Sequence, residues 1–149
     1  MYVVEQDGHV IVLDCGVTFP ERDQLGIDLV LPDFGYVRAR AGALAGVVLT
    51  HPHEDHIGGL PFLVRDLKPD APIPVYGSRF TLGLVRAKID EHKLLGDVDL
   101  IEVGPDRPVD VGPFHLEFES LRHSVPDGLA VTFRTGVGTI VHTGDFRYE

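Results

Sequence analysis

The sequence has a single cysteine and few basic residues, and both shortages narrow the possible functions. Cys15 has no second thiol with which to form an intramolecular disulfide, which fits a reducing compartment. Lysines and arginines number 13 against 23 aspartates and glutamates, so the formal net charge is −10. Such a chain lacks the broad positive surface that binds a nucleic-acid backbone non-specifically. If the substrate is a nucleic acid, local features must bind it.

Long apolar runs are missing as well. No window approaches the roughly 18 consecutive apolar residues of a membrane-spanning helix. Residues 1–12 have neither a basic start nor a long apolar stretch, so they do not resemble a signal peptide. We therefore expect a cytoplasmic protein with no membrane partner. Low-complexity segments and repeats are also absent, and 149 residues suffice for one globular core or part of one.

The sequence does contain short β-rich runs that alternate with helical patterns and are separated by turn residues. Strands are predicted over residues 2–5, 9–13, 46–50, 73–76, 100–103, 114–121, 129–134 and 139–142. Helices are predicted over residues 35–44, 57–67 and 78–94. This alternation predicts an α/β fold built of packed layers.

A cluster of metal-binding side chains directly follows the apolar run 46–50. The segment reads His51-Pro52-His53-Glu54-Asp55-His56 and is followed by two glycines. Residues two apart on extended backbone point the same way, so His51 and His53 can hold one ion. Asp55 and His56 then turn toward a second ion. A lone histidine is more often an ordinary polar side chain, but four such residues in six at a strand-to-helix junction predict a two-metal site.

Two further candidate ligands follow predicted strands in the second half of the chain. His123 comes after residues 114–121, and Asp145 comes after residues 139–142. Strand ends are where α/β folds place functional side chains. Taken alone, Asp145 is more often a turn residue than a ligand, but beside the first cluster both become predicted ligands. Histidine and aspartate suit zinc and tolerate manganese.

Other polar residues receive different predictions. Asp14, at the end of the strand predicted over residues 9–13, can accept a hydrogen bond from a ligand imidazole and fix its tautomer, or can be a plain turn residue. Cys15 is expected to be a small buried side chain, and Glu54 to face the scaffold. The other histidines are expected to lie away from the site; they are His9, His92, His115 and His142.

Together these motifs resemble the metallo-β-lactamase superfamily, whose fold is an αβ/βα sandwich of mixed sheets flanked by helices. Several phrases beyond the segment His51–His56 narrow the resemblance to the ribonuclease J family. They are Phe19-Pro20-Glu21, Leu25-Gly26-Ile27-Asp28, His123-Ser124-Val125-Pro126-Asp127 and Thr143-Gly144-Asp145-Phe146. The resemblance implies that residues 1–149 are part of a metallo-β-lactamase domain, without the β-CASP and C-terminal domains of that family.

The resemblance also implies a ligand set and an activity. His51, His53 and His123 would hold one zinc, Asp55 and His56 the other, and Asp145 would bridge them. A downstream histidine that completes the second site in the family is absent from these residues. RNA would be the substrate, with 5′–3′ exonuclease and endonuclease activity in mRNA decay and rRNA maturation. Asp55 would orient the attacking hydroxide as the catalytic residue, and no residue is assigned to substrate binding.

Two further expectations and two alternatives accompany this interpretation. The full-length protein is expected to be a homo-oligomer, and a structural calcium ion can lie near residues 25–28. One alternative is a small-molecule hydrolase of the same superfamily, such as a thioesterase or lactonase, because one fold hosts many chemistries. The other is an inactive fragment, because the incomplete second metal site and exposed sheet edges would weaken the isolated chain.

Overall fold

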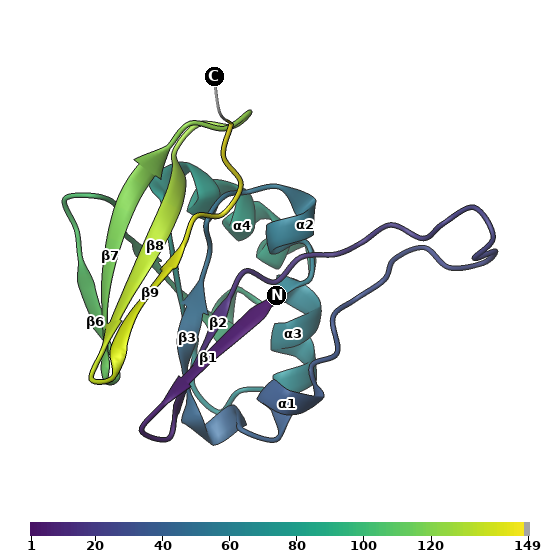
Figure 1. Ribbon diagram of the computed structural model, residues 1–149. Helices are drawn as coiled ribbons and strands as arrows, with labels where there is room; N and C mark the ends of the chain where they lie inside the picture. Colours follow the sequence, from purple (N-terminus) through teal and green to yellow (C-terminus); the bar gives the residue numbers. More distant parts are fainter. Residues whose placement is uncertain (148–149) are drawn as a thin grey trace.

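The computed structural model describes residues 1–147, which form two stacked β-sheets with helices on the outer face of the first (Figure 1). Side chains alternate between two cores along the first sheet. Val12 and Val47 pack with the helices, whereas Ile11 and Val48 pack with the second sheet. Because neighbouring strand residues point to opposite faces, these fully apolar runs suit a sheet that is covered on both sides. The predicted α/β layer architecture is confirmed.

The first sheet contains five strands in sequence order. They are β1 (Tyr2–Gln6), β2 (His9–Leu13), β3 (Leu44–Val48), β4 (Ile73–Gly77) and β5 (Val98–Glu102). β1 and β2 form an antiparallel hairpin through Asp7 and Gly8, which both have positive φ as a tight two-residue turn requires. β2 to β5 are parallel, so the ends of β2 and β3 meet at one edge.

The second sheet is antiparallel throughout. Its strands are β6 (Val109–Val111), β7 (Phe114–Leu121), β8 (Gly128–Thr135) and β9 (Gly138–His142). Phe114, Leu116 and Phe118 alternate with less buried residues and face the first sheet, which explains why β7 forms here. The sequence did not predict β6.

The helices depart from the sequence predictions in three places. They are α1 (Gly35–Arg38), α2 (Glu54–Ile57), α3 (Leu60–Leu67) and α4 (Arg79–Glu91), with 3-10 turns at Ala41–Ala43 and Leu95–Asp97. The helix predicted over residues 35–44 begins at Gly35 but ends at Arg38, and Leu44 instead pairs with Val10 in the parallel sheet. The predicted helix over residues 57–67 begins earlier and is interrupted at Gly58 and Gly59. α4 ends at Glu91, three residues before its predicted end.

An arm formed by residues 18–33 projects from the sandwich between β2 and α1 (Figure 1). Its two limbs are joined at the base, where Thr18 and Val30 exchange backbone hydrogen bonds of 2.9 and 2.8 Å. Apolar side chains such as Phe19 and Leu25 are exposed along it. Among residues 1–147, no helix is both long enough and apolar enough to cross a membrane.

Candidate metal centre

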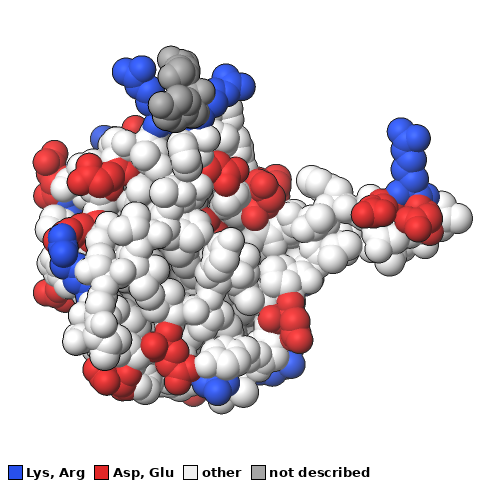
Figure 2. Space-filling model, viewed as in Figure 1, with Lys and Arg blue, Asp and Glu red and all other residues white. Residues whose placement is uncertain are grey.

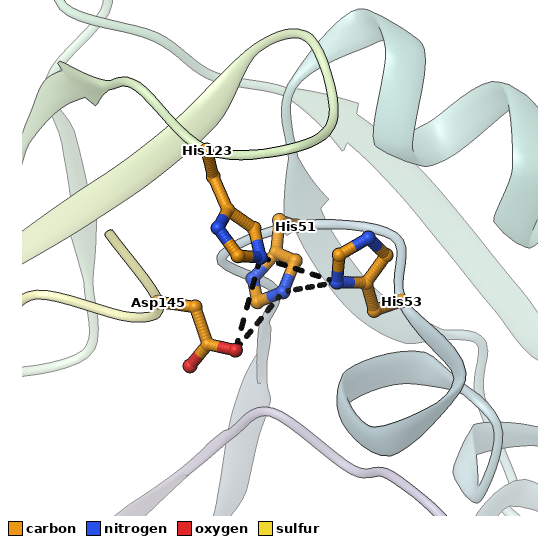
Figure 3. A group of neighbouring side chains, drawn as sticks. All are labelled: His51, His53, His123 and Asp145. Atoms are coloured by element: carbon orange, nitrogen blue, oxygen red, sulfur yellow. Dashed lines mark hydrogen bonds and ion pairs between the residues drawn. The ribbon is translucent and has the colours of Figure 1, made fainter. Parts of the chain in front are cut away.

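The six predicted metal ligands lie together at one end of the sandwich. The loop after β3 carries His51 and His53, and the adjoining α2 carries Asp55 and His56. The segments after β7 and β9 bring His123 and Asp145 to the same place. Figure 3 shows the side chains of His51, His53, His123 and Asp145 pointing toward one another from these separate segments. The fold therefore unites residues that lie far apart in the sequence.

The first group consists of three imidazoles and one carboxylate. His51 Nε2 and His123 Nε2 lie 3.1 and 3.3 Å from His53 Nδ1. The Oδ2 atom of Asp145 lies 3.8 Å from His51 Nε2 and 3.9 Å from His123 Nε2 (Figure 3). One potential ligand atom from each of the four residues lies within 4.8 Å of the others. This is the donor set predicted for one metal.

The second group contains Asp55, His56 and Asp145. The Nε2 atom of His56 lies 3.5 Å from Asp145 Oδ2 and 3.7 Å from Asp55 Oδ2. The Asp55 side chain is 66% exposed, whereas His56 is largely covered. Asp145 belongs to both groups. That shared position is the one predicted for a bridging carboxylate.

Asp14 is buried beneath both groups and contacts an imidazole of the second group. Its Oδ2 atom accepts a hydrogen bond from His56 Nδ1 at 2.7 Å and another from the Thr50 hydroxyl at 2.8 Å. Because the Thr50 hydroxyl donates its proton to Asp14, its oxygen is free to accept from His51 Nδ1, 3.0 Å away. Both rings then carry their proton on Nδ1 and turn an unprotonated Nε2 toward the centre.

Backbone contacts hold the loop after β2 against α2. The N–H groups of Cys15 and Val17 donate to the carbonyls of His56 and Glu54, at 2.7 and 3.0 Å. Gly16 makes this approach possible, because a Cβ atom there would lie 1.6 Å from the carbonyl oxygen of Asp55. A Cβ atom at Gly59 would lie 2.7 Å from the carbonyl oxygen of Gly16. The glycines that follow the metal motif thus also pack closely against the loop after β2.

Comparison with known proteins places this architecture in a family. The model of the metallo-beta-lactamase superfamily matches residues 1–149. The chain belongs to this superfamily. It is 44% identical over its whole length to ribonuclease J of Mycolicibacterium smegmatis, and covers 26% of that protein. It is 46% identical over 143 residues to ribonuclease J of Thermus thermophilus, which is 94% of this chain and 25% of that protein. The chain thus spans about a quarter of the length of these relatives.

Solved structures of the superfamily share the fold. The metallo-beta-lactamase fold protein YhfI from Bacillus subtilis aligns with a TM-score of 0.65 and 29% identity, over 99% of this chain and 55% of its own. The short form of human tRNase Z aligns with a TM-score of 0.65 and 20% identity, over 96% of this chain and 60% of its own. At 20% identity, the similarity to human tRNase Z shows a shared fold alone.

The pKa values of two histidines suit the candidate metal centre to binding cations. Burial and the nearby His56 lower the pKa of His51 to about 4, so its ring is neutral near pH 7. Burial also lowers the pKa of His56, but the hydrogen bond and charge of Asp14 outweigh it and, with Asp55 and Asp145, leave that pKa raised. His56 therefore favours a positive charge at Nε2, where two carboxylates face it. A metal cation bound at Nε2 would supply the positive charge that these carboxylates favour, as a proton does.

The donor set accordingly fits divalent metal ions. Unprotonated imidazole nitrogens and carboxylate oxygens converge, and each is a preferred zinc ligand. His123 differs from His51 and His56, since its Nδ1 atom is buried without a hydrogen-bond partner among the described residues. Within residues 1–147, two groups of side chains could hold a metal ion, those described above, and neither includes Asp28 from the segment expected near calcium.

The remaining histidines and Glu54 lie outside the centre, as expected. Glu54 points toward α4, where its Oε1 atom lies 2.7 Å from Lys88 Nζ. His115 pairs with Asp110, and His92 contacts Arg65. The sequence analysis missed Thr50 as the link between Asp14 and His51. The position of Thr50 directly before the metal motif could have suggested this role. Its hydrogen bond to Asp14, however, forms only because β2 and β3 lie side by side.

Proposed function

We propose that this chain is the metal-binding part of a ribonuclease of the ribonuclease J type, which hydrolyses RNA phosphodiester bonds. The main support for this proposal is that two groups of side chains share Asp145. Together these groups supply donors for two adjacent cations. The 44% and 46% identities to two ribonuclease J proteins support the choice of RNA over other superfamily substrates. In this proposal residues 1–149 are part of the metallo-β-lactamase domain of a longer protein.

The proposed ligands are those that the geometry brings together. His51, His53 and His123 would hold one zinc, Asp55 and His56 the other, and Asp145 would contact both; manganese suits the same donors. Two such cations would lower the pKa of a water molecule and neutralise charge on the phosphoryl oxygens.

The chain's own residues would orient the reacting groups. The buried Asp14 and Thr50 keep the Nε2 atoms of His51 and His56 directed into the centre. Asp55 stands at the rim on α2, with an exposed carboxylate near His56. From there it can accept a hydrogen bond from the attacking water, and we propose it as the catalytic carboxylate. Backbone hydrogen bonds to the loop after β2 fix the position of the helix that carries this carboxylate.

The proposal extends to the biological setting. It includes 5′–3′ exonuclease and endonuclease activity in mRNA decay and rRNA maturation, in the cytoplasm. It also includes a homo-oligomeric full-length protein and a structural calcium ion near residues 25–28. These points are supported by the sequence resemblance, and the free thiol of Cys15 fits the location.

Cleavage of 5′-monophosphorylated RNA by the zinc- or manganese-loaded full-length protein tests the proposal. His53→Ala and Asp55→Ala should each lower the rate by at least about 100-fold. His115→Ala is the matched control, because this imidazole lies outside the metal centre and pairs with Asp110. Hydrolysis of a thioester or lactone without any RNA cleavage would instead assign the protein to the small-molecule branch.

A further inference from the structure

Two arginines meet in a hollow beside the metal centre. Arg122 directly precedes His123, and Arg147 follows Asp145 by two residues. The backbone N–H of Arg147 donates to the carbonyl of Arg122 at 3.1 Å, which ties the segment after β9 to the segment after β7. Both arginines, together with His123 and Asp127, line a hollow of about 510 Å³. Two positive side chains are thereby held next to a proposed metal ligand.

The arginines of the chain differ in their electrostatic surroundings. Among residues 1–147, Arg38, Arg40, Arg107 and Arg134 each pair with a carboxylate, at 2.7 to 3.3 Å. Within residues 1–147, neither Arg122 nor Arg147 forms such an ion pair. Their hollow contains one carboxylate, that of Asp127, against two guanidinium groups. Among the described residues, its lining therefore carries more positive than negative side chains, although the whole chain carries a formal charge of −10.

The surface view agrees with this local excess. Figure 2 shows basic side chains flanking the top of the molecule, the end at which β7 and the C-terminal segment finish in Figure 1. Acidic side chains outnumber basic ones over the rest of the face shown. On the face shown, an anionic ligand would thus meet favourable charge at the end that carries the candidate metal centre.

We propose that Arg122 and Arg147 form a subsite for a backbone phosphate of single-stranded RNA, adjacent to the phosphate that is cleaved. A guanidinium group donates two parallel hydrogen bonds to phosphate oxygens, so the pair can hold one phosphate firmly. Because each arginine lies within two residues of a proposed ligand, a phosphate held there is placed relative to the metal centre. This inference rests on the proposed function and names the residues that bind its substrate.

Binding of a fluorescent RNA oligonucleotide with cleavage-resistant phosphorothioate linkages to the metal-loaded full-length protein tests the subsite. Arg122→Ala and Arg147→Ala should each weaken binding about 10-fold and raise KM for cleavable RNA with little change in kcat. Each lost phosphate contact should also lower the slope of log Kd against log salt by about 0.7. Lysine at either position should restore part of the affinity. Arg22→Ala, which removes the same charge from the arm, is the matched control.

The possible results separate the two proposals. Weaker binding and a smaller salt slope in both variants, with unchanged metal content and an unaffected Arg22→Ala, would support the subsite. RNA that binds the wild type and both variants equally would overturn the subsite and leave the ribonuclease proposal standing. A wild-type protein that neither binds nor cleaves RNA would overturn both.

Discussion

The Nδ1 atom of His56 lies 2.7 Å from the Oδ2 atom of Asp14, and this contact couples the end of β2 to the candidate metal centre. The same carboxylate reaches the other group of ligands through Thr50, whose hydroxyl lies 3.0 Å from His51 Nδ1. One buried carboxylate thus orients an imidazole in each group. Of the two roles considered for Asp14, its contact with His56 favours the one in which it orients an imidazole, and Thr50 extends that contact indirectly to His51.

Replacing this carboxylate should weaken metal binding without removing a ligand. In Asp14→Ala, neither His51 nor His56 has its orienting partner, so zinc affinity should fall about 10–100-fold. Competition with a chromophoric chelator measures that affinity. Asp110→Ala, which removes the partner of the exposed His115, is the control. Equal zinc affinity in wild type and Asp14→Ala would show that the contact does not organise the centre.

Gly16 should tolerate no side chain. The Cβ atom of Gly16→Ala would overlap the Asp55 carbonyl, so α2 and its two proposed ligands must shift. We expect the free energy of unfolding to fall by about 3 kcal/mol and zinc affinity to fall with it. In Gly83→Ala the new methyl group meets open space on α4, and stability should instead rise by about 0.5–1 kcal/mol. Urea unfolding compares the two, and a neutral Gly16→Ala would contradict the packing described here.

The sequence predicted the elements that have a regular apolar pattern between turn residues. β2 and β7 have the predicted bounds, since residues 9–13 and 114–121 carry that pattern without interruption. β6 is three residues long, too short to show a period. Residues 35–44 have a helix-compatible composition and form α1 at their start, but the pairing of Leu44 with Val10 ends the helical run before its predicted end. The arm has no periodicity that would have predicted its course.

The candidate ligands could be predicted from their local spacing in the sequence. The contacts between separate elements at the site could not. The four ligand-type residues between His51 and His56 are recognisable because one short segment contains them all. The partnerships of Thr50 with Asp14 and of Lys88 with Glu54 arise only when separate elements pack together. The meeting of Arg122 and Arg147 likewise depends on β7 and β9 ending at the same edge. Scattered arginines in the sequence gave no indication of it.

Two neighbouring carboxylates on α2 should behave differently. Asp55 faces His56, whereas Glu54 forms an ion pair with Lys88. Asp55→Asn should therefore lower metal content and abolish RNA cleavage. Glu54→Gln should leave both unchanged and lower the free energy of unfolding by less than about 1 kcal/mol, since its ion pair is partly exposed. Metal analysis after gel filtration distinguishes them, and loss of metal from Glu54→Gln would contradict the assignment.

Cys15 should be unreactive in the folded protein. Burial, reinforced by Asp14 and opposed by the N-terminal charge, raises the pKa of the thiol from 9.0 to about 12. The folded state therefore retains this proton more tightly than the unfolded state. The resulting stability is fully present below pH 9 and is lost as pH rises from 9 toward 12.

Iodoacetamide labelling checks this expectation. At pH 8 labelling should be slow in buffer and fast in denaturant. The free energy of unfolding should fall between pH 9 and pH 11 less steeply in Cys15→Ala than in the wild type. Rapid labelling under native conditions would show that the loop after β2 opens easily.

Titration of metal-free full-length protein with zinc or manganese, recording bound metal and RNA cleavage together, tests the central claim most directly. The two ligand groups that share Asp145 predict that cleavage appears as the second equivalent binds. They also predict that a chelator abolishes it. Full cleavage activity with no metal, or with a single equivalent bound, would contradict the two-metal account.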